Sequence, residues 1–167
     1  VYKRQILNNK IVDKQRLAAN LDPNDEASYA IFNQNDYAPT LMHQEAMQFI
    51  DRNKDEKFFL YYASPLPHLP LQAPQKWVDY YRQKLGPEKP YLGNSGYYPN
   101  RTPRATYAAM ISYLDEQVGE VVAKLKEIGR YENTFIIFSS DNGPTHKDKQ
   151  VDINFFNSTC LLYTSDA

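Results

Sequence analysis

Two short, continuously apolar runs stand out from an otherwise polar chain. Residues 58–63 read FFLYYA, and residues 134–140 begin with TFIIF before ending in two serines. Runs of this length, rich in aromatic and β-branched residues, are typical of strands that are buried on both faces. The sequence therefore predicts one buried strand at each run.

Three other stretches show the spacing of amphipathic helices. The first begins at Thr40 as its cap, the second covers residues 75–85 and stops at Gly86-Pro87, and the longest covers residues 103–128. Thr102 is the expected cap of the longest helix, with Pro103 at its first position. On that helix, Glu120 and Lys124 have the spacing of an i,i+4 ion pair.

The order strand, long helix, strand predicts a parallel pair joined by a right-handed crossover, and hence an α/β fold. The carboxyl ends of parallel strands meet at one edge of the sheet, where ligands bind in open α/β folds. If the two strands are neighbours, their axes are about 4.8 Å apart. Polar residues that follow each strand are then expected to share a site.

Such residues follow both predicted strands. Asp141 and Asn142 come directly after the second strand and precede Gly143-Pro144. His68 follows the first strand, within a stiff loop that contains four prolines. One carboxylate and one carboxamide are hard oxygen donors that suit Ca²⁺ or Mg²⁺, although two ligands are too few for calcium. Two alternatives stay open: Asp141 and Asn142 only cap the strand, and His68 is an ordinary surface histidine.

Composition narrows the class of protein. The chain has 167 residues, a net charge of −1 with mixed signs, and a single cysteine. It is long enough for one domain with a core and carries no basic surface of the kind that nucleic acids need. No apolar run is long enough to span a bilayer, and no signal peptide is visible. One cysteine excludes a disulfide framework.

Both ends of the chain look foreign to the rest. Residues 1–5 and 160–167 resemble translated sequencing adapters joined to a gene fragment. We therefore expect residues 6–159 to be the native part of the domain.

Several motifs together resemble the type I sulfatases of the alkaline-phosphatase superfamily, in particular their arylsulfatase A-like branch. They occur in family order over roughly residues 30–159: FFLYYA leading to PHLPLQ, then GYYPNR, YAAMISYLD and SDNGP. The resemblance implies an alkaline-phosphatase-like sandwich, with a mainly parallel central sheet flanked by helices. It also implies a sulfuric ester hydrolase that uses Ca²⁺, with Mg²⁺ as the second choice.

The resemblance also implies roles for individual residues. Asp141 and Asn142 match a pair of calcium ligands. His68 matches a histidine that contacts the sulfate and donates a proton to the leaving oxygen. We also assign Arg101, Arg104 and His146 to substrate binding; for the two arginines, the alternative is a solvated charge at a helix start. The family nucleophile is a formylglycine hydrate, made from Cys or Ser in a C/S-x-P-x-R motif, which attacks sulfur in line.

The chain departs from the family in what it lacks. It contains no C/S-x-P-x-R motif, and the family's first acidic metal pair and its later lysine have no counterpart. We therefore interpret it as an internal fragment of a catalytic domain from a periplasmic or secreted enzyme acting on a sulfated small molecule or glycan. Two alternatives are a phosphodiesterase or phosphonate hydrolase of the same superfamily, and a non-catalytic, calcium-stabilised binding module.

The missing nucleophile leads to a direct prediction. The purified 167-residue chain will not hydrolyse 4-nitrophenyl sulfate above the buffer rate, because no residue can form the formylglycine. Release of 4-nitrophenol, followed by absorbance with and without Ca²⁺, measures this. Turnover that scales with protein concentration would contradict it.

Overall fold

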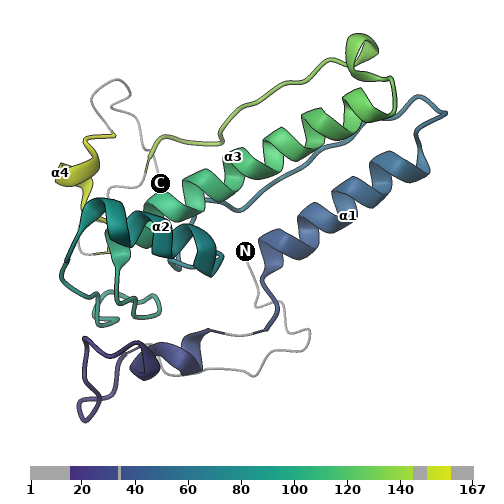
Figure 1. Ribbon diagram of the computed structural model, residues 1–167. Helices are drawn as coiled ribbons and strands as arrows, with labels where there is room; N and C mark the ends of the chain where they lie inside the picture. Colours follow the sequence, from purple (N-terminus) through teal and green to yellow (C-terminus); the bar gives the residue numbers. More distant parts are fainter. Residues whose placement is uncertain (1–15, 34, 145–149, 159–167) are drawn as a thin grey trace.

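The computed structural model describes residues 16–33, 35–144 and 150–158. Their elements, in order, are η1 (Glu26–Phe32), α1 (Ala38–Arg52), α2 (Gln75–Leu85), α3 (Pro103–Glu127), η2 (Tyr131–Asn133) and α4 (Ile153–Phe156). Figure 1 shows α3 running through the middle of the molecule, with α1 and α2 beside it. None of the helices in these ranges is long and apolar enough to cross a membrane.

The 25-residue helix α3 supplies more of the buried core than any other element. Pro103 opens it and Gly129, with φ of 67°, follows its end, as the pattern predicted. Both α1 and α2 contact α3. The main buried cluster joins α3 to the loop after residue 63 and to the segment before α4; its buried members are Leu66, Leu71, Tyr107, Met110, Tyr113 and Val151.

The predicted sheet is not confirmed. Residues 58–63 and 134–140 are extended, but they form no strand ladder, and the described ranges contain one isolated bridge, between Tyr91 and Asn100. Figure 1 shows both segments running back along α3 toward its beginning, so they share a direction, as parallel strands would.

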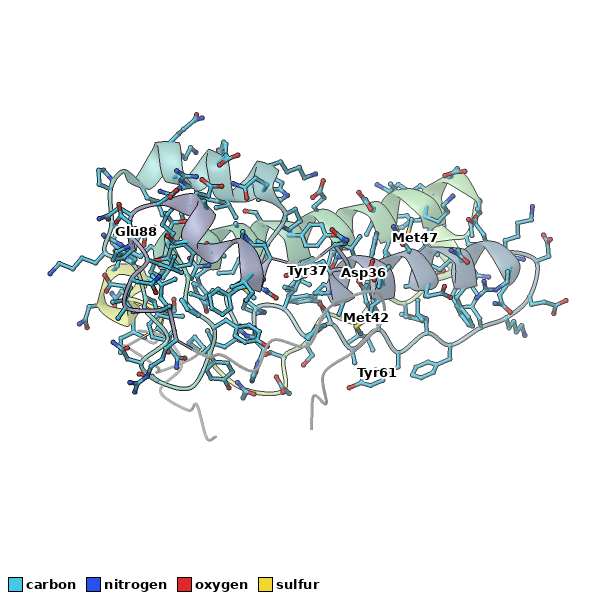
Figure 2. All side chains as sticks on the ribbon, turned by 90° about the horizontal axis from the view of Figure 1, so that it is seen from below. Asp36, Tyr37, Met42, Met47, Tyr61 and Glu88 are labelled. Atoms are coloured by element: carbon cyan, nitrogen blue, oxygen red, sulfur yellow. The ribbon has the colours of Figure 1, made fainter. Side chains whose placement is uncertain are left out.

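Burial of the two apolar runs was also predicted, and this is wrong for the chain as it stands. Phe59 is 86% exposed, Phe135 is fully exposed and Ile137 is 89% exposed. Figure 2 shows Tyr61 on the outer side of its segment. A strand is buried on both faces only when neighbouring strands and covering helices are present, and the described residues supply too few of either.

The helix starts also differ from the prediction. Thr40 is not a cap: α1 begins two residues earlier, after Tyr37, and the Thr40 hydroxyl lies 2.7 Å from that of Tyr113 on α3. Thr102 occupies the cap position of α3 but makes no side-chain capping bond. Glu88 replaces it, since its carboxylate accepts from the backbone N–H groups of Arg104 at 2.6 Å and Ala105 at 3.0 Å.

Several charged residues of α3 bond to other elements, although Lys124 also pairs within the helix with Glu127 at 3.1 Å. Glu120 and Lys124 do not pair; Glu120 bonds to His43 of α1, and Lys124 bonds to Asp51 at 3.3 Å. Further along, Glu116 accepts from Lys76 and, at 2.8 Å, from the Trp77 indole of α2. Burial works to raise the pKa of Glu116, but these two hydrogen bonds and the nearby charges of Lys76 and His43 together outweigh it and lower the pKa. Polar contacts thus fasten both neighbouring helices to α3.

Capping by Glu88 gives a testable prediction. Its side chain is 3% exposed and also faces the Arg104 guanidinium at 3.6 Å. Replacing Glu88 with Ala leaves two helix N–H groups without their acceptor, so the free energy of unfolding should fall by about 2 kcal/mol. Urea unfolding followed by circular dichroism measures this. Glu132→Ala, at an exposed position, is the matched control; an equal loss in both variants would contradict the capping role.

Candidate functional site

His68 lies in a loop that is anchored on both sides. Leu66 and Leu71 are buried in the α3 cluster, and the Asn100 amide donates to the Leu71 carbonyl at 3.0 Å. The Tyr37 hydroxyl donates to the Gln72 carbonyl. The loop therefore carries an exposed histidine on a backbone whose position is fixed by the core.

The orientation of the His68 ring is set by its neighbours. Its Nδ1 lies 2.7 Å from the Leu69 carbonyl oxygen, which can only accept, so the hydrogen is on Nδ1. The ring also meets Tyr97 edge to face, with centroids 6.2 Å apart. A histidine held through Nδ1 has Nε2 as the ring nitrogen for proton transfer, an arrangement that suits a general acid or base.

Asp141 and Asn142 lie at the exposed end of the second extended segment. The Asn142 amide donates to the Gly143 carbonyl at 2.7 Å, and the Ser140 hydroxyl donates to the Asn142 carbonyl at 2.7 Å. These are turn contacts of the kind that the strand-cap alternative describes. The two roles are compatible, because the side-chain oxygens are not used in these bonds.

The metal-binding capacity of this pair is incomplete. In the part of the chain that the structure describes, no group of three or more His, Cys, Asp or Glu side chains is placed to hold a metal ion. The donor types fit Ca²⁺, but calcium takes six to eight oxygens. The described residues alone do not make a calcium site.

Both predicted arginines are in ion pairs. Arg101 bonds to Glu26 of η1, Nη2 to Oε2, at 3.0 Å. Arg104 lies against Glu88, 3.9 Å from an oxygen of Asp152 and 4.7 Å above the centre of the Phe155 ring. Both arginines therefore stabilise contacts within the fold. Their role in substrate binding stays a prediction. His146 lies outside the described residues.

A cleft of about 570 Å³ opens beside Arg104. Its wall combines residues of the 86–102 loop with the segment before α4, including Lys89, Asn94 and Gln150. Gln150 is 3% exposed, and its amide nitrogen donates to the Ser95 carbonyl at 2.7 Å. The sequence indicated a long loop here, but nothing in its pattern predicted that Glu88 would fold back to cap α3 and form one side of the cleft.

Comparison with known proteins identifies the family. The sulfatase family model matches residues 1–163. Arylsulfatase J of Mus musculus is 35% identical over 108 residues, which is 64% of this chain and 16% of that protein. The arylsulfatase of Klebsiella aerogenes is 30% identical over 122 residues, covering 54% of this chain and 26% of that protein.

The solved structures agree. A crystal structure of Ps i-CgsB in complex with k-i-k-neocarrahexaose superposes with a TM-score of 0.50 and 32% identity, over 68% of this chain and 24% of that chain. The chain belongs to the sulfatase family. It spans only between 16% and 28% of the length of the first three curated relatives.

The incomplete metal site predicts weak calcium binding. Titration of the 167-residue chain with CaCl₂ by calorimetry should give a Kd in the millimolar range or weaker, because two protein oxygens leave most of the shell to water. Asp141→Asn should remove what binding there is, whereas Asp115→Asn, on the exposed face of α3, should not. Tight stoichiometric binding would contradict the view that the site is incomplete.

Proposed function

We propose that residues 6–159 are an internal part of the catalytic domain of a sulfuric ester hydrolase. The observation that carries this proposal is the family match over residues 1–163, together with a histidine held through Nδ1 at the motif position. The two extended apolar segments support it, because they have the composition of central strands and run in one direction. In the whole protein, further chain would pair with them and cover their exposed side chains.

In this proposal His68 is the proton donor to the leaving oxygen. Its Nδ1 hydrogen bond to the Leu69 carbonyl orients the ring. The charged ring then has a hydrogen on Nε2 for the departing alcohol or phenol. The nearby Tyr97 ring limits how the imidazole can turn.

Asp141 and Asn142 are proposed as two of the calcium ligands. They supply one charged and one neutral oxygen at the end of an extended segment, and the remaining ligands and the formylglycine would come from sequence outside this chain. When bound, the ion would neutralise charge on the sulfate oxygens. The Asn142 amide bond to Gly143 would hold its side-chain oxygen away from the turn.

The 86–102 loop and the first turn of α3, up to Arg104, are proposed to shape the leaving-group side. The cleft beside Arg104 is lined by polar groups able to bond hydroxyls, which suits a sulfated small molecule or glycan. Arg101, Arg104 and His146 are the proposed further contacts, and the arginines would have to exchange their present acidic partners for substrate. A periplasmic or secreted location fits a family that contains arylsulfatases and N-acetylgalactosamine-6-sulfatases.

Two other functions remain as outcomes of a test. A phosphodiesterase or phosphonate hydrolase of the same superfamily would use the same sheet edge with a bare Thr or Ser nucleophile. A non-catalytic binding module would keep calcium without a nucleophile. The flanking gene sequence separates all three, since a C/S-x-P-x-R motif upstream indicates a sulfatase.

The deciding experiment uses the complete gene product. Expressed together with a formylglycine-generating enzyme, it should hydrolyse 4-nitrophenyl sulfate and not bis(4-nitrophenyl) phosphate. His68→Gln should lower kcat by about 10²- to 10⁴-fold, the usual loss when a general acid is removed. The deficit should be smaller for a substrate whose leaving group needs no proton.

The control variant is Glu132→Gln, an exposed position in η2, which should keep the full rate. Preference for the phosphodiester would favour the first alternative, and calcium binding without any hydrolysis would favour the second. Unchanged kcat in His68→Gln would overturn the role of His68 while leaving the sulfatase assignment in place.

A further inference from the structure

A polar cluster joins α1, α3 and the extended segment 58–63; His43 and Gln117 are buried in it, and the Glu120 side chain is 53% exposed. His43 of α1 is 6% exposed, and its Nε2 lies 2.7 Å from a carboxylate oxygen of Glu120. Its Nδ1 lies 3.3 Å from the hydroxyl of Tyr62. That hydroxyl is 3.2 Å from Oε1 of Gln117, whose amide nitrogen donates to the Pro39 carbonyl at 3.1 Å. The proposed sulfatase chemistry uses none of these groups.

Counting hydrogens along the cluster fixes the direction of each bond. The Pro39 carbonyl only accepts, so Gln117 presents its NH₂ there and turns its oxygen toward Tyr62. That oxygen also only accepts, so the single hydroxyl hydrogen of Tyr62 goes to Gln117.

The same count then decides the state of the histidine. With its hydrogen given to Gln117, the Tyr62 oxygen can only accept from Nδ1 of His43. The Glu120 carboxylate accepts from Nε2. Both ring nitrogens therefore carry hydrogen, which is the imidazolium form. If the ring were neutral, the single hydroxyl hydrogen of Tyr62 would have to serve two acceptors, Nδ1 of His43 and Oε1 of Gln117. One of these acceptors would then have no donor, which is costly for a buried group.

We propose that His43 is a protonation-dependent clamp: as an imidazolium it fastens α1 and the 58–63 segment to α3, and on losing a proton it releases one of these links. The proposal is independent of the sulfatase assignment. It reaches the candidate site, however, because the clamped segment leads directly into the loop that carries His68.

The charged and titratable groups around the ring are compatible with this. From α3 it faces Glu120 and, one turn earlier, Glu116, whose pKa is lowered in part by the charge on His43. From the extended segment it faces Tyr62, and burial raises the pKa of that phenol to about 12, so the phenol keeps its hydrogen at neutral pH. Lys76 of α2 is bonded to Glu116 and does not contact the ring through any described hydrogen bond.

The sign of the pH dependence follows. Loss of the proton from His43 removes one of its two links, so the stabilisation from the clamp is present at low pH and absent at high pH. Because the Glu120 side chain is 53% exposed, solvent screens this pair, and the folding equilibrium constant should fall by about two- to fivefold between pH 5.5 and 8.0. Urea unfolding of the 167-residue chain at the two pH values measures the change.

His43→Gln should abolish this pH-dependent loss, and His68→Gln, at an exposed histidine, is the matched control that should keep it. Glu120→Gln should reduce the loss, whereas Asp115→Asn, on the exposed face of the same helix, should not. An undiminished loss in His43→Gln would overturn the clamp.

A second measurement does not depend on any variant folding. In the chain labelled with ¹⁵N-histidine, long-range ¹H–¹⁵N spectra report whether each ring nitrogen carries hydrogen. As the pH is raised from 5.5 to 8.0, the buried histidine should keep both hydrogens at pH values where the exposed His68 has lost one. A bare Nδ1 on the buried ring wherever His68 is still charged would overturn the proposal.

Discussion

Packing against one face of α3 is the constraint on which the other elements depend. Tyr107, Met110 and Tyr113 form the centre of the buried cluster, and the loop after residue 63 reaches them through Leu66 and Leu71. Full burial of one apolar side chain of this size contributes about 1.5–3 kcal/mol to stability. The position of His68 is therefore a consequence of helix packing, because the leucines on either side of it are held by α3.

Polar contacts add direction to this packing. Glu88 caps the start of α3. Glu116 accepts a hydrogen bond from Trp77 of α2, and Glu120 bonds to His43 of α1. Each of these carboxylates accepts bonds that a purely apolar interface would not orient. Because apolar burial has little directional preference, these bonds are what choose one arrangement of the helices around α3.

The two extended segments, 58–63 and 134–140, are not buried by packing against α3 alone. Phe59, Phe135 and Ile137 face solvent although they have the composition of a sheet interior. An exposed apolar surface of this kind is typical of an interaction surface. Since the chain spans 16% of the mouse arylsulfatase and 26% of the Klebsiella enzyme, this exposure is consistent with its membership of the sulfatase family.

The sequence by itself determined α2, α3 and the family. Helical spacing predicted α2 at residues 75–85 and placed α3 to within one residue, because 3.6-residue periodicity and proline or glycine at the ends are local signals. Ordered motifs around His68 and Asp141 predicted the sulfatases, which the comparisons confirmed.

The tertiary structure decided the rest. Capping of α3 by Glu88, the pairing of Glu120 with His43, and the exposure of the apolar segments all depend on residues far apart in the chain. Periodicity carries no information about such contacts, because they arise only when separate elements pack together.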